Sequence, residues 1–427
     1  MNYHFLHGLR VVESSAFIAA PLAGMTLSQF GADVIRIDLP GGGIDYARQP
    51  TVSGGRSLYW TGLNKGKRSF AVDIRRPEGR ELVQSLVTAT GGGAGVLLTN
   101  IGASWLSHAT LSKLRQDVIT CTIEGNADGS TAVDYTVNCA VGIPAMTGNG
   151  SISSPVNHVL PAWDIACAYQ AAFAITTAWT QRQRTRAGAE LRIALADVAF
   201  SMLAHLGMSA EAELLDQERP SQGNYLYGAF GRDFPTRDKR RVYVAAISLA
   251  QWKNLVMACS LQQPIATLEN RLSLDFAKEN DRYEAREDIA AIVESWTALR
   301  TLAEISDLFD RQGVCWGVYQ TVREALKNDP RMSEANPVFA RIQTPGVGEH
   351  LAAGTPVRIA HCPRGPIDPA PLLGQHTDEV LLEVLGLDSA VVGKLHDSGL
   401  VAGPERDPCV GWQQVLQRDT AQVDPKE

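Results

Sequence analysis

The sequence predicts an α/β protein with a parallel sheet and a second, smaller α+β domain. In the opening third, short apolar runs alternate with helical patterns, which is typical of a parallel sheet with helical crossovers. At 427 residues the chain is longer than one hydrophobic core usually supports. Near residue 216 Pro, Gly, Asn and Tyr cluster, and a more charged stretch follows. These three observations together predict two domains.

Local patterns and stop signals justify each predicted element in turn. Apolar runs bounded by turn residues predict the strands, and longer apolar patterns predict the helices. Gly31 is a normal stop for the first helix, and Pro77 fits the first turn of the next one. In the first part of the chain we predict strands over 9–13, 33–38, 95–99, 118–123 and 191–195, and helices over 21–30, 77–90, 165–183 and 197–215. Further along we predict a strand over 242–247 and helices over 249–260, 282–299 and 302–312.

The domain boundaries follow the changes in composition. We predict the first part of a large domain over 1–215, a linker over 216–240, a small α+β domain over 241–328, a return to the large domain over 329–403, and a polar, poorly ordered tail over 404–427.

Bulk composition excludes several classes of protein. A net charge of -7 without a long basic run argues against a nucleic-acid partner. No apolar run approaches the roughly 18 residues needed to cross a bilayer, and the first residues lack a signal-peptide pattern. The 7 cysteines are scattered and odd in number, which favours reduced thiols. We therefore expect a cytoplasmic protein with neither a membrane nor a nucleic-acid partner.

The most informative local feature is the segment 157–164, which leads into the apolar helix predicted from Ile165. Asp164 stands at the start of that helix. It is a helix cap in one reading, because Asp accepts backbone hydrogen bonds there and contributes about 1 kcal/mol. In the other reading, the amide groups at the helix start hold the aspartate ionised, and an ionised carboxylate can attack a thioester carbonyl. The two readings are compatible.

Other motifs are less specific. The segment 64–69 packs Lys65, Lys67 and Arg68 around a glycine, which fits either a solvated loop or a clamp for the phosphates of a nucleotide-bearing cofactor. The glycine run 41–43 lacks the spaced glycines of a dinucleotide site, so a nicotinamide oxidoreductase is weakly supported. Without His-x-x-x-His or Cys-x-x-Cys pairs we predict no metal, and without a Gly-x-Ser-x-Gly elbow a serine hydrolase is disfavoured.

Five separate segments resemble the class III CoA-transferases. They are 8–13, 31–38, 64–69, 73–79 and 371–379, and the likeness extends from about residue 6 to about residue 401. A closer likeness is to the branch of this family that moves CoA between the two carboxyl groups of one mesaconate molecule in the 3-hydroxypropionate cycle of carbon fixation. The segments 7–13, 156–165 and 223–234 suggest it.

The resemblance implies a fold and a site. The fold is a large Rossmann-like domain made of both chain ends, a small middle domain, and two subunits threaded through each other as an interlocked homodimer. Asp164 falls where the family has its nucleophilic aspartate, which favours the functional reading. The positions matching the family's CoA contacts are Ala19, Ala20, Lys67, Arg68, Asn100, Ile101 and Tyr135. As partners for the free carboxylate of the substrate we nominate Arg48, His158, Asn224, Tyr225 and Arg232, although each also has a purely structural reading.

The implied reaction passes through covalent intermediates on Asp164. An aspartyl anhydride forms first and an aspartyl-CoA thioester second, and CoA returns to the opposite end of the same acid. We expect no cofactor beyond the CoA of the substrate and no metal. One alternative is an intermolecular CoA-transferase acting on another dicarboxylic or small carboxylic acid. Another is a CoA-binding protein without catalysis, for which Asp164→Ala would leave function intact.

Overall fold

The computed structural model describes residues 3–148 and 154–409, which form two compact units. Within the described residues, the first unit draws on 3–141, 160–209 and 330–409, and the second on 142–148, 154–159 and 210–329. The first unit thus takes residues from both ends of the chain. Among the described residues, none of the helices combines the length and hydrophobicity that crossing a bilayer requires.

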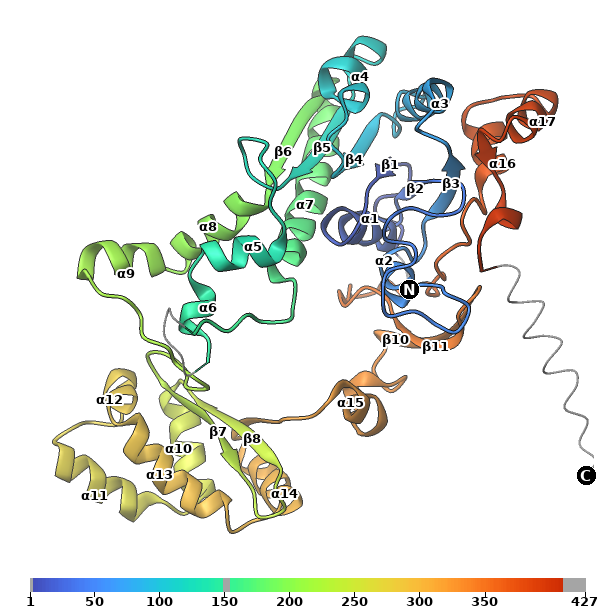
Figure 1. Cartoon of the computed structure of the whole chain (residues 1–427). Coiled ribbons are helices and arrows are strands. Elements are labelled where there is room, and N and C mark those ends of the chain that lie inside the picture. Colours follow the sequence, from blue (N-terminus) through green and yellow to red (C-terminus); the bar gives the residue numbers. More distant parts are fainter. Residues whose placement is uncertain (1–2, 149–153, 410–427) are drawn as a thin grey trace, which may run out of the picture. The chain divides into compact units, whose positions relative to one another are not determined.

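The first unit is built on a seven-stranded sheet in the order β12-β3-β2-β1-β4-β5-β6 (Figure 1). Its strands are β1 Arg10–Ser14, β2 Asp33–Asp38, β3 Arg68–Val72, β4 Val96–Thr99, β5 Ile119–Glu124, β6 Ala189–Ala194 and β12 Val401–Ala402. β1 to β6 run parallel, and only β12 is antiparallel to its neighbour. The prediction of an α/β fold with a large parallel sheet is confirmed, and the order of β1 to β6 is that of a doubly wound dinucleotide-binding fold.

The two faces of this sheet differ in polarity because side chains alternate along each strand. Val12, Ile35 and Ile37 point into an apolar core that α3 (Pro77–Val87), α4 (His108–Leu114) and the C-terminal segments 380–392 complete. Their neighbours in sequence, Glu13 and Arg36, are equally buried but lie in a polar network on the side of α1 (Ala19–Gln29). α7 (Ala162–Thr185) packs along α1.

Further helices of the first unit are α2 Leu58–Leu63, α5 Asp134–Ala140, α8 Leu195–His205, α16 Thr377–Glu379 and α17 Ser389–Asp397, and a hairpin is formed by β10 Phe339–Thr344 and β11 Gly348–Ala353. β3 was not predicted, because its first residues Arg68 and Ser69 are polar and belong to the segment 64–69, which fits either a solvated loop or a phosphate clamp. The helix predicted over 197–215 is divided at Gly207, whose φ of 74° ends α8 before α9 (Met208–Leu215) begins.

The second unit contains a three-stranded antiparallel sheet and a cover of helices. Its strands are β7 Phe230–Pro235, β8 Arg241–Ala246 and β9 Cys315–Val318. Its helices are α6 Ile143–Met146, α10 Leu249–Ala258, α11 Gln262–Leu272, α12 Glu279–Glu284, α13 Arg286–Thr297, α14 Leu302–Gln312 and α15 Val322–Asn328. Phe230 and Phe234 of β7 pack against Trp252 of α10 and the inner faces of α13 and α14.

The boundaries differ from those predicted at three places. Residues 230–235 lie within the predicted linker but form β7, whose Phe230 and Phe234 are fully buried. The first part of the predicted large domain is shorter, because residues 142–148, 154–159 and 210–215 belong to the second unit. In the predicted tail, 404–406 form a 3-10 turn, and Asp407 and Cys409 are buried. Residues 410–427 of that tail lie outside the described residues.

Candidate active site at the switch point of the parallel sheet

The strand order places the topological switch point of the sheet between β1 and β4. From β1 the chain crosses to β2 on one side, and from β4 it crosses to β5 on the other. In a doubly wound sheet, ligands bind outside the carboxyl ends of the strands at this switch point. Ala19 and Ala20, predicted as CoA contacts, begin α1 directly after β1, and Asn100 and Ile101 follow β4. The structure therefore brings these four predicted residues to one end of the sheet.

The loop after β1 is fixed from two sides. The Asn100 side chain accepts a hydrogen bond from the Ala16 N–H at 2.9 Å and donates one to the Ala16 carbonyl at 2.7 Å. Phe17 has a φ of 68°, a left-handed conformation that costs a non-glycine residue on the order of 1–3 kcal/mol. Its N–H donates to Asp45 Oδ2 at 3.1 Å. The loop conformation is thus held by side chains from two other segments.

Asp164 lies in the first turn of α7, but Asp134 is the residue that caps this helix. The backbone N–H groups of Trp163 and Asp164 both donate to Asp134 Oδ2, at 2.8 and 3.0 Å. Asp134 is buried at the start of α5. The carboxylate of Asp164 has no hydrogen-bond or ion-pair partner among the described residues. The reading of Asp164 as a simple helix cap is therefore wrong, because another carboxylate already occupies the helix start.

The environment of Asp164 makes its carboxylate unusually basic. Burial raises the pKa of Asp164 to about 6, and the negative charge of Asp134 adds to the increase. At pH 7 such a group is still roughly nine-tenths ionised. A poorly solvated carboxylate with an elevated pKa is in general a better nucleophile than a solvated one.

The electrostatic effect of Asp164 extends to Tyr59, whose ring also contacts a cation. The Arg48 guanidinium lies over the ring of Tyr59 at 5.1 Å and over that of Phe17 at 5.4 Å. Burial raises the pKa of Tyr59 to about 12, Arg48 opposes the increase, and the charge of Asp164 adds to it. Tyr135 also contributes to the increase in the pKa of Tyr59. Arg48 is exposed and has no acidic partner within the described ranges, so it is a cation available to a ligand carboxylate.

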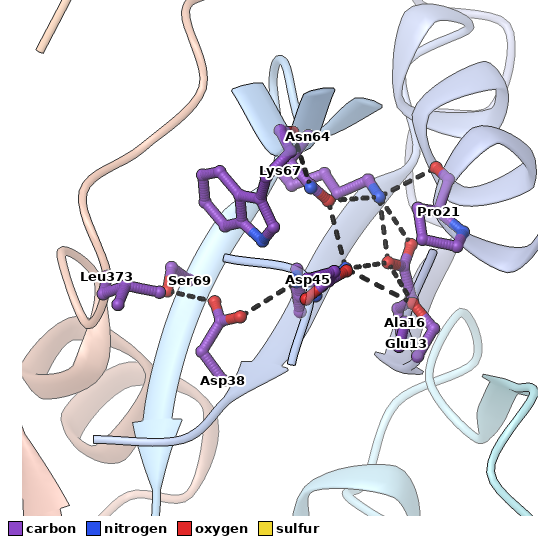
Figure 2. A network of polar contacts seen from close by, with 12 residues as sticks. Glu13, Ala16, Pro21, Asp38, Asp45, Asn64, Lys67, Ser69 and Leu373 are labelled. Carbon is purple, nitrogen blue, oxygen red and sulfur yellow. Dashed lines mark hydrogen bonds and ion pairs between the residues drawn. The ribbon is translucent and has the colours of Figure 1, made fainter. Parts of the chain in front are cut away.

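Lys67, another predicted CoA contact, points into a buried polar network instead (Figure 2). Its ammonium donates to Glu13 Oε1, the Pro21 carbonyl and Asn64 Oδ1 at 2.8–2.9 Å, which uses all three N–H groups. Burial lowers the pKa of Lys67 to about 8, while Glu13 opposes the decrease. In this structure the positive charge of Lys67 is paired with Glu13 inside the protein.

Arg36 stands at the centre of the same network. Its guanidinium donates to Asp38 at 2.9 Å and to Asp45 and Glu13 at 3.2–3.3 Å. Asp45 is also the acceptor for the Phe17 N–H. The network therefore connects the interior of the sheet to the loop that borders the switch point.

Arg68 lies at the other end of the sheet. It begins β3, and its guanidinium pairs with Asp33 at 2.6 Å and with Glu379 at 2.8 Å. Asp33 begins β2 and also binds Arg10 of β1 at 2.7 Å. Because parallel strands start at the same edge, these residues are at the amino ends of the strands, away from the switch point.

The other predicted carboxylate contacts belong to the second unit. Asn224 donates to Asp233 at 2.9 Å, and Arg232 donates to the Tyr225 hydroxyl at 3.2 Å and lies 3.6 Å from Glu294. Asn224, Tyr225 and Arg232 line a cavity of about 450 Å³. His158 is half-buried in this unit.

Sequence reasoning missed three residues of the site: Asp134, Tyr59 and Phe17. Tyr59 is in a six-residue helix and Asp134 begins a seven-residue one, both too short for a periodic signal. An available signal was the pair Asp134-Tyr135, which places an acid and an aromatic side chain next to a predicted CoA contact.

Comparisons with known proteins identify the family of this chain. The family model "CoA-transferase family III" matches residues 6–377. A 2-methylfumaryl-CoA isomerase from Chloroflexus aurantiacus is 52% identical over 403 residues, covering 94% of this chain and 98% of the relative. A formyl-CoA:oxalate CoA-transferase from Rhodopseudomonas palustris is 26% identical over 94% of this chain and 98% of its own. A CAIB/BAIF family protein from Brucella suis has a solved structure with a TM-score of 0.72 and 25% identity, covering 90% of this chain and 100% of that one. The chain therefore belongs to CoA-transferase family III.

Proposed function

We propose that this protein moves CoA between the two carboxyl groups of mesaconate, converting 2-methylfumaryl-CoA to 3-methylfumaryl-CoA. The observation that supports it most directly is the Asp164 carboxylate, which is partly buried, lacks a partner among the described residues, and has a pKa raised to about 6. The 52% identity to a 2-methylfumaryl-CoA isomerase over 94% of the chain supports the choice of substrate.

The reaction begins with attack by Asp164 on the thioester carbonyl. The C–S bond breaks, CoA thiolate leaves, and an anhydride joins Asp164 to mesaconate. The thiolate then attacks the aspartyl carbonyl, which breaks the anhydride C–O bond and leaves an aspartyl-CoA thioester with free mesaconate.

The second half repeats these steps from the other end of the acid. The carboxylate that was free in the substrate attacks the aspartyl thioester and displaces CoA thiolate. The thiolate attacks the acyl carbon of the new anhydride, so that the product forms and Asp164 is released as a carboxylate. No proton or electron is consumed, and the scheme needs no metal or cofactor beyond the CoA of the substrate. The enzyme supplies position and excludes water.

Arg48 is our first candidate for the group that retains mesaconate between the two halves of the reaction. Its guanidinium is exposed and lacks an acidic partner in the described part of the chain. It lies over the ring of Tyr59, whose pKa is also raised by the charge of Asp164. A dicarboxylate held by Arg48 at one end presents its other end for reaction, and planar guanidinium–carboxylate pairing favours a defined orientation. His158, Asn224, Tyr225 and Arg232 remain predicted contacts.

The CoA moiety is proposed to bind along the switch point. The N–H groups at the start of α1, next to Ala19 and Ala20, favour an anionic ligand. Asn100 and Ile101 from the β4 loop and the exposed ring of Tyr135 complete this surface. Lys67 and Arg68 are left out, because the first is paired with Glu13 inside the protein and the second lies at the opposite edge of the sheet.

A labelling experiment tests whether transfer is intramolecular. Purified enzyme is incubated with mesaconyl-CoA and isotopically labelled free mesaconate, and the CoA esters are analysed during turnover. We expect isomerisation without an added acceptor and without label in the thioester. Rapid entry of label would contradict intramolecular transfer and support the alternative, an intermolecular family III transferase, which the 26% identical formyl-CoA:oxalate CoA-transferase represents among the relatives.

We also propose that the protein is a homodimer. Three large apolar side chains, Tyr169 and Phe173 of α7 and Phe200 of α8, are 51%, 67% and 48% exposed, and a second copy would remove them from water. Light scattering coupled to size exclusion measures the mass directly, and a monomer of 46.1 kDa would contradict the proposal. The interlocked arrangement and the cytoplasmic location stay predictions.

A further inference from the structure

The segment that ends the described chain is clamped to the loop that carries Arg48. Asp407 is buried, and its carboxylate accepts hydrogen bonds from the Tyr46 hydroxyl at 2.7 Å and from the Leu373 N–H at 2.7 Å. Its Oδ2 lies 3.6 Å from Nη1 of Arg56, and both of these side chains are fully buried. Tyr46 and Arg56 both belong to the loop 39–57 that joins β2 to α2.

The contacts around this carboxylate make the clamp rigid. The ring of Tyr46 packs edge-on against Trp60 at 5.1 Å, and the Arg56 guanidinium lies over the same indole at 5.3 Å. Cys409 and Leu373 complete this small apolar cluster. A buried guanidinium requires a nearby negative charge, so Asp407 is an electrostatic requirement for this arrangement and not only a packing contact.

The same loop is also held by the buried polar network around Arg36. Asp45 precedes Tyr46 directly and binds both Arg36 and the Phe17 N–H. The Arg48 N–H donates to the Asp45 carbonyl at 3.2 Å, so the backbone at Arg48 is fixed between these two anchors. The Arg48 side chain then lies over the rings of Tyr59 and Phe17. A change at either anchor is expected to move this guanidinium.

We propose that Asp407 is a positioning residue for the reaction: through Tyr46 and Arg56 it sets the conformation of the loop 45–56 and thereby directs Arg48 at the free carboxylate of the substrate. This inference rests on the proposed function, because it takes Arg48 as the group that holds that carboxylate. Asp407 lies beyond the residues 6–377 that the family model matches.

The test compares Asp407→Asn with Tyr46→Phe, and with Glu405→Gln as a matched control. Glu405 lies in the 3-10 turn just before Asp407, is exposed, and accepts a hydrogen bond from the Gly403 N–H. With mesaconyl-CoA as substrate, well below each variant's melting temperature, we expect a roughly tenfold loss of kcat/KM for Asp407→Asn, mostly through a higher KM, and a smaller loss in the same direction for Tyr46→Phe. The control should match the unmodified enzyme.

Coupling to Arg48 separates positioning from general destabilisation. In an Arg48→Gln background, Asp407→Asn should cause no further loss of kcat/KM, because the group it positions is already gone, while its effect on the melting temperature should be the same in both backgrounds. Equal fold-losses of kcat/KM in the two backgrounds would overturn the proposal, as would an Asp407→Asn enzyme with unchanged kcat/KM.

Hydrogen exchange tests, independently of the substrate, whether Asp407 holds the loop 45–56. In Asp407→Asn we expect faster amide exchange in peptides covering 45–56 and unchanged exchange in peptides covering 33–38. If the protein does not isomerise mesaconyl-CoA, the proposed function fails while faster loop exchange still supports the clamp. If isomerisation proceeds and loop exchange is unchanged in Asp407→Asn, the clamp fails while the proposed function stands.

Discussion

Replacing Asp164 with asparagine is expected to inactivate the enzyme and to stabilise its fold at the same time. The folded-state pKa of Asp164 is raised from 3.8 to about 6, mainly by burial. The native state therefore holds the proton more tightly than the unfolded chain does. The stability that this gives is fully present below pH 4 and is lost as the pH rises through 6, so at pH 7 the ionised carboxylate destabilises the fold by about 3 kcal/mol.

The asparagine variant removes that cost because the Asp164 carboxylate has no hydrogen-bond partner to lose among the described residues. We expect the melting temperature of Asp164→Asn to exceed that of the unmodified protein by roughly 6 °C at pH 7.5, taking about 2 °C per kcal/mol for a unit of this size. The difference should disappear at pH 4, where Asp164 is protonated. Turnover should fall by at least about 10³-fold, since the proposed nucleophile is gone.

The assay is thermal unfolding followed by circular dichroism between pH 4 and 8, with isomerase activity measured on the same samples. Asp288→Asn is the matched control, since Asp288 is also the third residue of its helix, α13, but is exposed and paired with Arg271. It should neither stabilise the protein nor change turnover. An Asp164→Asn variant that is no more stable than the unmodified protein at pH 7.5 would refute the electrostatic argument, and one that keeps normal turnover would refute covalent catalysis.

Three further predictions concern pH, packing and the two arginines. Because Asp164 must be ionised to attack, log(kcat/KM) should fall with unit slope below about pH 6, and a limb near pH 4 would contradict the raised pKa. Gly24→Ala should destabilise the fold by about 2–3 kcal/mol, because the added Cβ would clash with the buried Glu13 carboxylate. Gly393→Ala, at a helical glycine with open space around it, should not destabilise the fold, and equal urea midpoints for the two variants would contradict this. Arg48→Gln should raise KM for mesaconyl-CoA about tenfold or more while Arg68→Gln leaves KM unchanged, and the reverse pattern would return Arg68 to the binding site.

The parallel sheet was predictable where the local signal and the tertiary environment agree. The run 33–38 contains three aliphatic residues, stands between Gly31 and a glycine-rich loop, and forms β2 with the predicted bounds. β3 was missed because two of its five residues, Arg68 and Ser69, are polar, and only partners distant in the sequence satisfy them. Ser69, for instance, is fully buried and accepts the Gly374 N–H, which no local pattern shows.

The site was predictable in part for the same reason. Asp164 stands out because it opens a long apolar helix, so its position is local information. Asp134 accepts the backbone N–H groups at that helix start from 30 positions away in the sequence. No local sequence pattern indicates this contact. Lys67 shows another limit of local patterns, because its ion pair with the buried Glu13 joins residues 54 positions apart.

The two aspartates at the start of α7 show how one environment produces two roles. A helix start offers N–H groups that would stabilise a carboxylate, lower its pKa and reduce its reactivity. Here Asp134 takes the N–H groups of Trp163 and Asp164, and the carboxylate of Asp164 is left with burial and a like charge instead. Both effects oppose ionisation, so the carboxylate that remains ionised at neutral pH is poorly stabilised and basic, as a nucleophile for a thioester should be. Capping by Asp134 is thus what allows Asp164 to stand at a helix start without being stabilised by it.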